Sequence, residues 1–362
     1  MIKSFDEVFE DVTKLGVKIK TDEYHPIGKY QIIDQGQEAV AGYSDLEDGV
    51  FENVPAIVFG DHTRIVKYVD QPFFLGADGV KVLRSRFKDA NYRYLYYALK
   101  SVKIPNTGYN RHFKWLKEAK IYYPNSEEQS KIVLILDGIS SVIEHRQRQL
   151  QKLDELVKAR FIELFGTETE FDKWPCCTIG DVADVCVGVV IKPTQYYTDK
   201  GIPAFRSLNI GEMHVKDSDW VYFTEDGHQK NQKSVVHKND VLVVRSGAPG
   251  TACVATEKYD GYNAVDIIIA HPDNSKVNSI FLAAFTNMPH GMNQIRERTG
   301  GAAQQHFNVG DYKAMRLIMP SIELQNQYAA FVEQTDKSKV AVQKALDEAQ
   351  LLFDSLMQKY FG

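Results

Sequence analysis

The chain carries one segment twice, and this duplication constrains the fold more than any other feature. Residues 121–166 align without a gap with residues 317–362. Both copies begin near a proline, Pro124 or Pro320, and both end on a phenylalanine–glycine pair. Neither copy contains another proline after its first one. Because proline is the strongest interruption of a helix, each copy is predicted to form one continuous helix.

The apolar residues of each copy recur with heptad spacing. Steps of four and three residues from Ile132 to Leu164 meet eight apolar residues at ten positions, and the same steps from Tyr328 to Tyr360 do so again. This is the a/d pattern of a coiled-coil seam. Each copy is predicted to be a helix of about 38 residues and about 57 Å. We expect the two helices to pack on each other; the alternative is that each packs on its own globular domain.

The segments before the two helices share an order of short elements. Residues 50–83 alternate between apolar and polar residues and are predicted to form strands, followed by a helix from Arg93. Strand-like segments from Asp240 and Ala264 and a helix from Ser279 repeat this order. The predicted fold class is α+β, with two α/β lobes joined by two long helices. These helices are expected to form an antiparallel coiled coil with pseudo-two-fold symmetry.

Composition is typical of a soluble globular protein, with 44% apolar and 25% charged residues. No stretch approaches the ~20 apolar residues of a membrane span, and the N-terminus lacks a basic-then-apolar leader. We therefore expect a cytoplasmic protein without a membrane partner. Four cysteines occur without a C-x-x-C pair and are expected to be reduced thiols; they are Cys176, Cys177, Cys186 and Cys253.

Motifs for catalysis are absent from the sequence. The phrase "GAPGT" at Gly247 lacks the lysine of a phosphate-binding loop. No glycine-rich cofactor fingerprint, zinc-protease motif, serine-hydrolase motif or amino-methyltransferase tetrapeptide is present. The histidines lack ligand spacing. The chain is therefore predicted to be non-catalytic, with no cofactor and no metal of its own.

Polar phrases at matched places in both lobes suit nucleic-acid binding instead. Asparagine and glutamine can pair with adenine, and arginine and lysine can pair with guanine, while small residues let the backbone approach a phosphate. Any one phrase is equally explained as a solvated loop, and the net charge of −5 argues against DNA binding unless a partner supplies cations. The candidates for DNA contact are His62, Thr63, Arg64, Asn110, Arg111, His112, Lys114, Arg206, Asn209, Arg245, Ser246, Thr299, Gln304, Gln305 and His306.

Several phrases together resemble the specificity subunit of type I restriction–modification systems, over essentially the whole chain. They are "VPAIVFGDHTRIVKYVDQPFFLGADGVKVL", "NDVLVVRSGAPGTACV" and "GAAQQHFNV" in the lobes, with "PNSEEQSKI", "PSIELQNQY", "FIELFG" and "MQKYFG" at the helix ends. Two departures stand out. Leu324 replaces the acidic residue that matches Glu128, and the first lobe has no close equivalent of the Gly-Ala-Ala-Gln phrase.

The resemblance implies a DNA-recognition subunit whose two lobes each read one half of a bipartite site in double-stranded DNA. It implies target-recognition domains at residues 1–124 and 167–320, and helical spacers at residues 125–166 and 321–362. The helices are implied to set the half-site spacing and to dock two methyltransferase subunits, which hold S-adenosylmethionine; restriction subunits can join them. Partner contacts are implied at the helix entries, at Glu127, Gln129, Glu323 and Gln325.

Two other functions are compatible with the sequence. A protein–protein adaptor would use the lobes to bind peptides and the helices as a strut, and would show no DNA affinity in any complex. A hydrolase would place its active site between the lobes, although the motifs for such an enzyme are missing.

Overall fold

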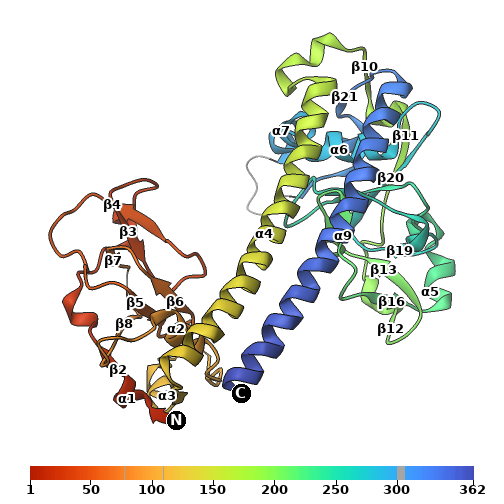
Figure 1. Ribbon diagram of the computed structural model, residues 1–362. Helices are drawn as coiled ribbons and strands as arrows, with labels where there is room; N and C mark the ends of the chain where they lie inside the picture. The colour runs from red at the N-terminus through yellow and green to blue at the C-terminus, as the bar shows by residue number, and fades with distance from the viewer. Residues whose placement is uncertain (77, 109, 300–305) are drawn as a thin grey trace. The chain divides into compact units, whose positions relative to one another are not determined.

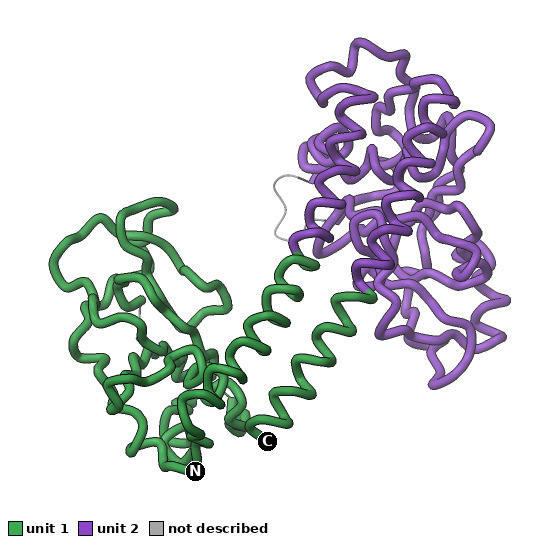
Figure 2. The backbone as a smooth tube through the Cα atoms, viewed as in Figure 1, with its two compact units in different colours: residues 1–147, 344–362 green, residues 148–343 purple. Residues whose placement is uncertain are grey.

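A computed structural model describes residues 1–76, 78–108, 110–299 and 306–362. It divides into two compact units, coloured separately in Figure 2. Unit 1 comprises residues 1–147 and 344–362, and unit 2 comprises residues 148–343. Each unit therefore contains one lobe and a part of each long helix. The division cuts the helices in the middle, so it does not test the predicted boundaries between lobes and spacers.

The duplicated segments form the two long helices of Figure 1, α4 (Ser126–Phe165) and α9 (Ile322–Phe361), of 40 residues each. Both begin after their proline, where a polar side chain accepts a hydrogen bond from a backbone amide of the first turn that has no partner in the helix. The Asn125 side chain accepts from the Glu128 amide at 2.8 Å, and the Ser321 hydroxyl accepts from the Leu324 amide at 3.3 Å. Such caps compensate for the missing hydrogen bonds of a helix start.

The helices pack together along the predicted seam, with the antiparallel orientation expected. In unit 1 the first half of α4 packs on the end of α9, where Leu136 and Phe353 share one core. In unit 2 the second half of α4 packs on the start of α9, where Val157 and Val332 share another. All ten predicted seam positions of each helix are buried or half-buried. The coiled-coil prediction is confirmed.

The lobe of unit 1 is built on a four-stranded antiparallel sheet, with a mixed three-stranded sheet and a two-stranded sheet beside it. The four-stranded sheet has the order β2 (Phe9–Asp11), β8 (Val80–Ser85), β5 (Ala56–Gly60) and β6 (Val66–Val69). The others are β4 (Gly42–Ser44), β3 (Tyr30–Ile33) and β7 (Phe73–Leu75), and β1 (Ile2–Ser4) with β9 (Lys120–Tyr122). The helices are α1 (Phe5–Val8), α2 (Tyr92–Lys100) and α3 (Phe113–Lys117).

The described residues of the unit 2 lobe form two four-stranded and two two-stranded sheets. The antiparallel one has the order β11 (Ala183–Val187), β20 (Ile267–Pro272), β17 (Val241–Val244) and β18 (Ala252–Val254). The mixed one has the order β12 (Tyr197–Thr198), β16 (Val221–Phe223), β13 (Ile202–Phe205) and β19 (Asn263–Ala264). The pairs are β10 (Cys176–Thr178) with β21 (Arg316–Ile318), and β14 (Ile210–Gly211) with β15 (His214–Val215). The helices are α5 (Glu225–Lys230), α6 (Ser279–Asn287), α7 (Pro289–Thr299) and α8 (Val309–Lys313).

The two lobes repeat one plan, as the sequence predicts. The order β2-β8-β5-β6 in unit 1 corresponds to β11-β20-β17-β18 in unit 2, and the pair β1-β9 corresponds to β10-β21. Helix α2 contacts β5 and β6, and α6 contacts β17 and β18. Both helices are capped by an asparagine side chain, Asn91 or Asn278. The repeat therefore extends from the sequence of the long helices to the topology of the lobes.

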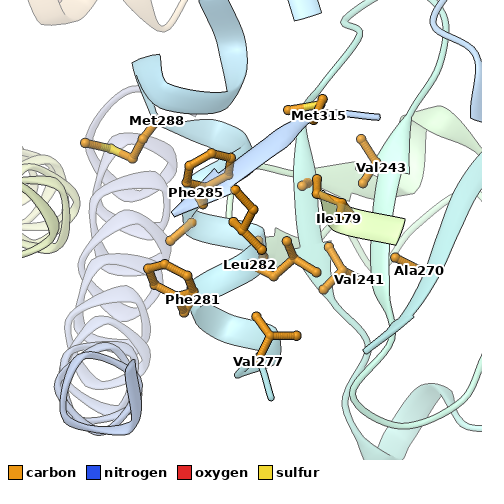
Figure 3. Packing of buried hydrophobic residues seen from close by; sticks show 14 of the residues in the cluster. Ile179, Val241, Val243, Ala270, Val277, Phe281, Leu282, Phe285, Met288 and Met315 are labelled. Atoms are coloured by element: carbon orange, nitrogen blue, oxygen red, sulfur yellow. The ribbon is translucent and has the colours of Figure 1, made fainter. Parts of the chain in front are cut away.

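Apolar burial joins each lobe to its part of the helix pair. Figure 3 shows Phe281, Leu282 and Phe285 of α6 beside Val241 and Val243 of β17. The same core includes Phe161 and Tyr328 of the long helices, whose rings lie 5.4 Å apart. Because one contiguous core usually defines one domain, the helix halves are part of each unit's folded core and not separate rods. Within the described residues, no helix has the length and apolar composition to cross a membrane.

Candidate nucleic-acid interface

In unit 1, the Gln35 side chain joins the turn after β5 to a neighbouring segment of the lobe. The Gln35 side chain accepts from the His62 amide at 3.1 Å and donates to the Asp78 carbonyl at 3.1 Å. The Thr63 hydroxyl donates to the Gln35 carbonyl at 2.6 Å. A Cβ on Gly60 would lie 2.2 Å from that hydroxyl oxygen, so this close approach requires glycine. Gln35 thus presents Thr63 on an exposed and ordered turn.

The second predicted segment of this lobe docks on the same turn through a buried histidine. The His112 amide donates to the Asp61 carbonyl at 2.7 Å, and the His112 Nδ1 lies 3.0 Å from that carbonyl. The Phe113 amide donates to the Asp61 carboxylate at 2.7 Å. His112 is 0% exposed. It joins two loops and leaves its neighbours Arg111 and Lys114 exposed.

In unit 2, Arg245 follows β17 directly and occupies the place of Asp61. Its guanidinium pairs with Asp266 at 2.7 Å and donates to the Phe307 carbonyl at 3.1 Å and to His306 Nε2. Because arginine only donates, His306 Nε2 must accept, and His306 Nδ1 then donates to the Ser246 hydroxyl at 2.7 Å. Arg245 is 7% exposed, and each of its three guanidinium nitrogens has a hydrogen-bond partner, whereas His306 is exposed.

Both lobes therefore build the same junction with different chemistry. In each, the residue that follows the matched strand bonds to a His–Phe pair, His112–Phe113 or His306–Phe307. The residue that makes these bonds is an acid in unit 1, Asp61, and a base in unit 2, Arg245. Equivalent loops are thus held in place by unlike, buried polar groups.

A groove of about 630 Å³ lies beside the turn in unit 1. Arg64, Lys100 and Lys103 are among the residues that line it, and Thr63 lies at its edge. Nearby, Lys18 pairs with Asp78 at 2.7 Å, and this hydrogen bond lowers the pKa of the Asp78 carboxyl. The negative charge at this edge is therefore offset by a lysine, and the groove carries a local excess of cations despite the acidic composition.

Arg206, Asn209 and Thr299 have structural hydrogen bonds. The Asn209 side chain accepts from the Arg206 amide at 2.9 Å and donates to the Ser218 carbonyl at 2.7 Å. The Thr299 hydroxyl donates to the Ile295 carbonyl at 2.9 Å at the end of α7. Asn209 and Thr299 are buried, so the surface available at these positions comes from the Arg206 side chain.

The predicted DNA-binding residues thus fall into four groups. Exposed are Thr63, Asn110, Arg111, Lys114 and His306; half-buried are His62, Arg64, Arg206 and Ser246; buried are His112, Asn209, Arg245 and Thr299. Gln304 and Gln305 lie outside the described residues. Gln35, Asp61 and Asp266 position these residues but were not among the predicted site residues. Asp61 lies inside the phrase "VPAIVFGDHTRIVKYVDQPFFLGADGVKVL", whereas no sequence signal marks Gln35.

The sequence model of the type I restriction modification DNA specificity domain matches residues 1–155 and 172–349. The chain belongs to this family. The resemblance noted from the sequence is thereby confirmed. Because the two matched ranges contain both lobes and most of both long helices, the specificity-domain match supports the duplicated plan seen in the structure.

Two curated members of the specificity family are similar to this chain. The specificity subunit of the type I restriction enzyme MjaIX from Methanocaldococcus jannaschii is 22% identical over 266 residues, covering 67% of this chain and 60% of the relative. The EcoBI specificity subunit from Escherichia coli is 23% identical over 279 residues, covering 68% of this chain and 58% of the relative. The chain spans about three-fifths of the length of these relatives.

A solved structure of a type I restriction–modification S subunit from M. genitalium has the same fold. Its TM-score is 0.61 at 17% identity, and the match covers 100% of this chain and 96% of that chain. This agreement confirms the predicted fold class of two lobes with two long helices.

At the helix entries of this specificity-family chain, two predicted partner residues are buried. The Gln129 side-chain amide donates to the Pro124 carbonyl at 3.0 Å, and the Gln325 side-chain amide donates to the Pro320 carbonyl at 2.9 Å. The Gln325 side chain also accepts from the Asn278 amide at 2.9 Å, which ties α9 to the start of α6. Their matched neighbours Glu127 and Glu323 are exposed. The glutamines thus act inside the fold, and the glutamates are the surface groups.

Proposed function

We propose that this chain is the DNA-recognition subunit of a type I restriction–modification complex. Its two lobes, residues 1–124 and 167–320, would each read one half of a bipartite site in double-stranded DNA. The long helices, residues 125–166 and 321–362, would serve as spacers and dock two methyltransferase subunits. Methyl transfer, with S-adenosylmethionine, is assigned to those partners and cleavage to restriction subunits. Such a complex acts on DNA in the cytoplasm.

The duplicated junction with unlike chemistry is the observation that carries this proposal. Equivalent turns after β5 and β17 dock on equivalent His–Phe pairs, but an acid makes the bonds in unit 1 and a base makes them in unit 2. Because base edges are distinguished by their donor and acceptor patterns, unlike exposed side chains beside these two junctions suit two different half-sites. The exposed Thr63, Arg111 and Lys114 in one lobe and His306 in the other are the proposed contacts.

The long helices carry exposed apolar side chains that the seam does not use. Leu134 is 76% exposed on α4, and Leu351 is 73% exposed on α9. Isolated apolar residues are ordinary on a protein surface. Several exposed apolar side chains on the same two long helices favour a surface that binds another protein. We assign this surface, together with Glu127 and Glu323, to the methyltransferase subunits.

The decisive experiment maps DNA methylation in cells that express the complex with wild-type or variant chain. The double variant Arg111→Ala/Lys114→Ala is expected to weaken methylation and to relax sequence preference in one half-site only. His306→Ala is expected to affect the other half-site only. Lys152→Ala, an exposed substitution on α4, is the matched control and should leave the pattern intact. Loss of methylation without any half-site bias would contradict the assignment of one lobe to each half-site.

Partner docking is tested separately by co-purification. Leu134→Glu and Leu351→Glu place a charge on each exposed apolar position and are expected to reduce recovery of the methyltransferase subunit. Ser141→Glu introduces the same charge at an exposed polar position of α4 and serves as control. Full recovery with both leucine variants, or equal loss with the serine variant, would refute this docking surface. An adaptor without DNA affinity predicts no methylation change in any of these variants.

A further inference from the structure

Three reactive side chains form a line on one face of the sheet in unit 2, away from the proposed DNA contacts. Cys186 lies on β11, His271 lies on the neighbouring strand β20, and Asp240 immediately precedes β17. The Cys186 sulfur is 3.6 Å from His271 Nε2, and His271 Nδ1 is 2.7 Å from the Asp240 carboxylate. This is the order of groups that activates a cysteine nucleophile: thiol, imidazole and carboxylate.

The carboxylate is fixed by the fold, and it fixes the imidazole. Asp240 is 3% exposed, and its second carboxylate oxygen accepts from the His237 amide at 2.6 Å. Because Asp240 can only accept, His271 Nδ1 carries a proton and donates it. The other ring nitrogen, Nε2, is thereby directed at the sulfur. Asp240 thus sets both the tautomer and the orientation of His271.

Charge at this site favours a protonated imidazole. The hydrogen bond with Asp240, followed by that with Cys186, raises the pKa of His271 to about 10. Asp184 lies directly opposite His271 in the strand register and is near Lys313 at 3.9 Å, while His237 pairs with Asp260 at 3.5 Å. An imidazolium that donates to sulfur stabilises the thiolate, the reactive form of cysteine.

The Cys186 sulfur has two hydrogen-bond partners in this arrangement. The Cys186 sulfur lies 3.2 Å from the Lys233 carbonyl and 3.6 Å from His271 Nε2. The Lys233 carbonyl accepts from the neutral thiol, and the His271 imidazolium donates to the thiolate. Cys186 is half-buried and the His271 side chain is 30% exposed, so a small molecule can approach the sulfur from solvent.

The other three cysteines lack this arrangement and provide internal comparisons. All four are free thiols. Burial raises the pKa of Cys253 to about 12 and also raises the pKa of Cys177. The Cys176 sulfur lies near the Trp174 carbonyl at 3.5 Å, and hydrogen bonds with Asp172 and then Cys176 raise the pKa of Arg316. The cation beside Cys176 is therefore an arginine, which cannot act as a base.

We propose that Cys186 is a thiol-modification site that exchanges with low-molecular-weight disulfides, with His271 as proton carrier and Asp240 as its positioning residue. The Cys186 thiolate, paired with the imidazolium of His271, attacks one sulfur of the disulfide. A new bond forms between Cys186 and that sulfur while the original sulfur–sulfur bond breaks. The leaving thiolate takes the proton from His271 Nε2, so one thiol and one disulfide are consumed and one of each is produced. This inference does not depend on the proposed function.

The test measures labelling of each cysteine in the full chain by peptide mass spectrometry, with oxidised glutathione and separately with iodoacetamide as probes. At pH 7, Cys186 is expected to react at least about tenfold faster than Cys176 or Cys177. Between pH 8 and pH 6, labelling of Cys177, whose pKa is raised by burial, should fall about tenfold per pH unit as its thiolate is lost. Labelling of Cys186 should fall much less.

His271→Gln and Asp240→Asn are expected to reduce the Cys186 rate to that of Cys176 and to restore the ordinary pH dependence. Circular dichroism and the unchanged labelling of buried Cys253 establish that each variant is folded. Arg316→Gln is the matched control, because it removes the cation beside Cys176 and leaves the Cys186 site intact. Equal rates for Cys186 and Cys176, or a Cys186 rate that His271→Gln does not change in a folded chain, would overturn the proposal.

Discussion

In unit 2, the ammonium group of Lys339 lies 2.8 Å from the carboxylate of Asp154, so an ion pair joins α9 to α4 at a seam position. Lys339 also pairs with Asp336 at 3.2 Å on its own helix, and its side chain is 23% exposed. The matched position of α4 is Ile143, an apolar residue. The duplicated seam thus has a charged layer in unit 2 where unit 1 has an apolar one.

Replacing this lysine tests how much the charged layer stabilises the helix pair. Partly buried ion pairs contribute little net stability, because desolvation of the charges offsets their attraction. Lys339→Met keeps the volume and removes the charge, and it should leave the free energy of unfolding unchanged or raise it by about 1 kcal/mol. Lys339→Ala removes the packing as well and should lower it. Urea denaturation measures both, and a clear loss of stability in the methionine variant would show that the ion pair itself stabilises the fold.

The Gln325 amide provides a second stability test. Gln325→Ala leaves the Pro320 carbonyl and the Asn278 amide without their partner inside the fold. Buried groups left unsatisfied cost about 1–3 kcal/mol each, so we expect a loss of about 2 kcal/mol or more in the free energy of unfolding. Gln327→Ala, at an exposed position of the same helix, should change stability by less than about 0.5 kcal/mol. Equal effects of the two substitutions would be inconsistent with the structural role of Gln325.

His271 predicts a pH dependence of stability. Its folded pKa is raised to about 10 by the hydrogen bond with Asp240, above the ordinary value of about 6.5. The ion pair therefore contributes fully below about pH 6.5, and its contribution falls as pH rises towards about 10. The difference in unfolding free energy between wild type and His271→Gln should be largest near pH 6 and should shrink by pH 10. If the difference in unfolding free energy grew as pH rose, the result would contradict a stabilising ion pair between His271 and Asp240.

The acidic composition predicts that DNA affinity depends on partners. With a net charge of −5, the chain alone should bind duplex DNA weakly, because each phosphate contact depends on a cation. In complex with methyltransferase subunits, binding should be tight and should fall steeply with salt. Filter binding over a salt series, with and without the partner, measures how DNA affinity depends on salt concentration for the complex and for the chain alone. If the chain alone bound DNA as tightly as the complex, the partner would not be the source of the phosphate-binding cations.

Helix length predicts the gap between half-sites. Insertion of one heptad into both helices, after Gln147 and after Gln343, adds about 10 Å and preserves the seam register. The gap between methylated half-sites should then lengthen by about three base pairs, at about 3.4 Å per pair. Insertion into one helix alone breaks the pairing of the two seams and should impair folding or assembly. Methylation mapping reads the result, and an unchanged gap in a folded double-insertion variant would count against the spacer role.

The sequence by itself determined the two long helices and the repeated plan. Heptad spacing is a local property, so all ten seam positions of each copy could be predicted from steps of four and three residues. The succession of strands and a helix along each lobe was also predicted, since the same order of short segments precedes both long helices. The charge of the Lys339 layer was visible, but its partner Asp154 was not, because seam spacing does not state which residue of the other helix lies opposite.

Only the tertiary structure decided which polar side chains face solvent. His112 and Arg245 were predicted to contact DNA because of their chemistry, yet both are buried by contacts with residues distant in sequence. The alignment of Cys186, His271 and Asp240 likewise depends on the register of three strands that the sequence separates. A hydrogen bond forms only when its two atoms are placed to within a fraction of an ångström. The spacing of residues in the sequence gives their periodicity and not these atomic positions. Periodic burial can therefore be inferred from one chain, but pairwise contacts require the fold.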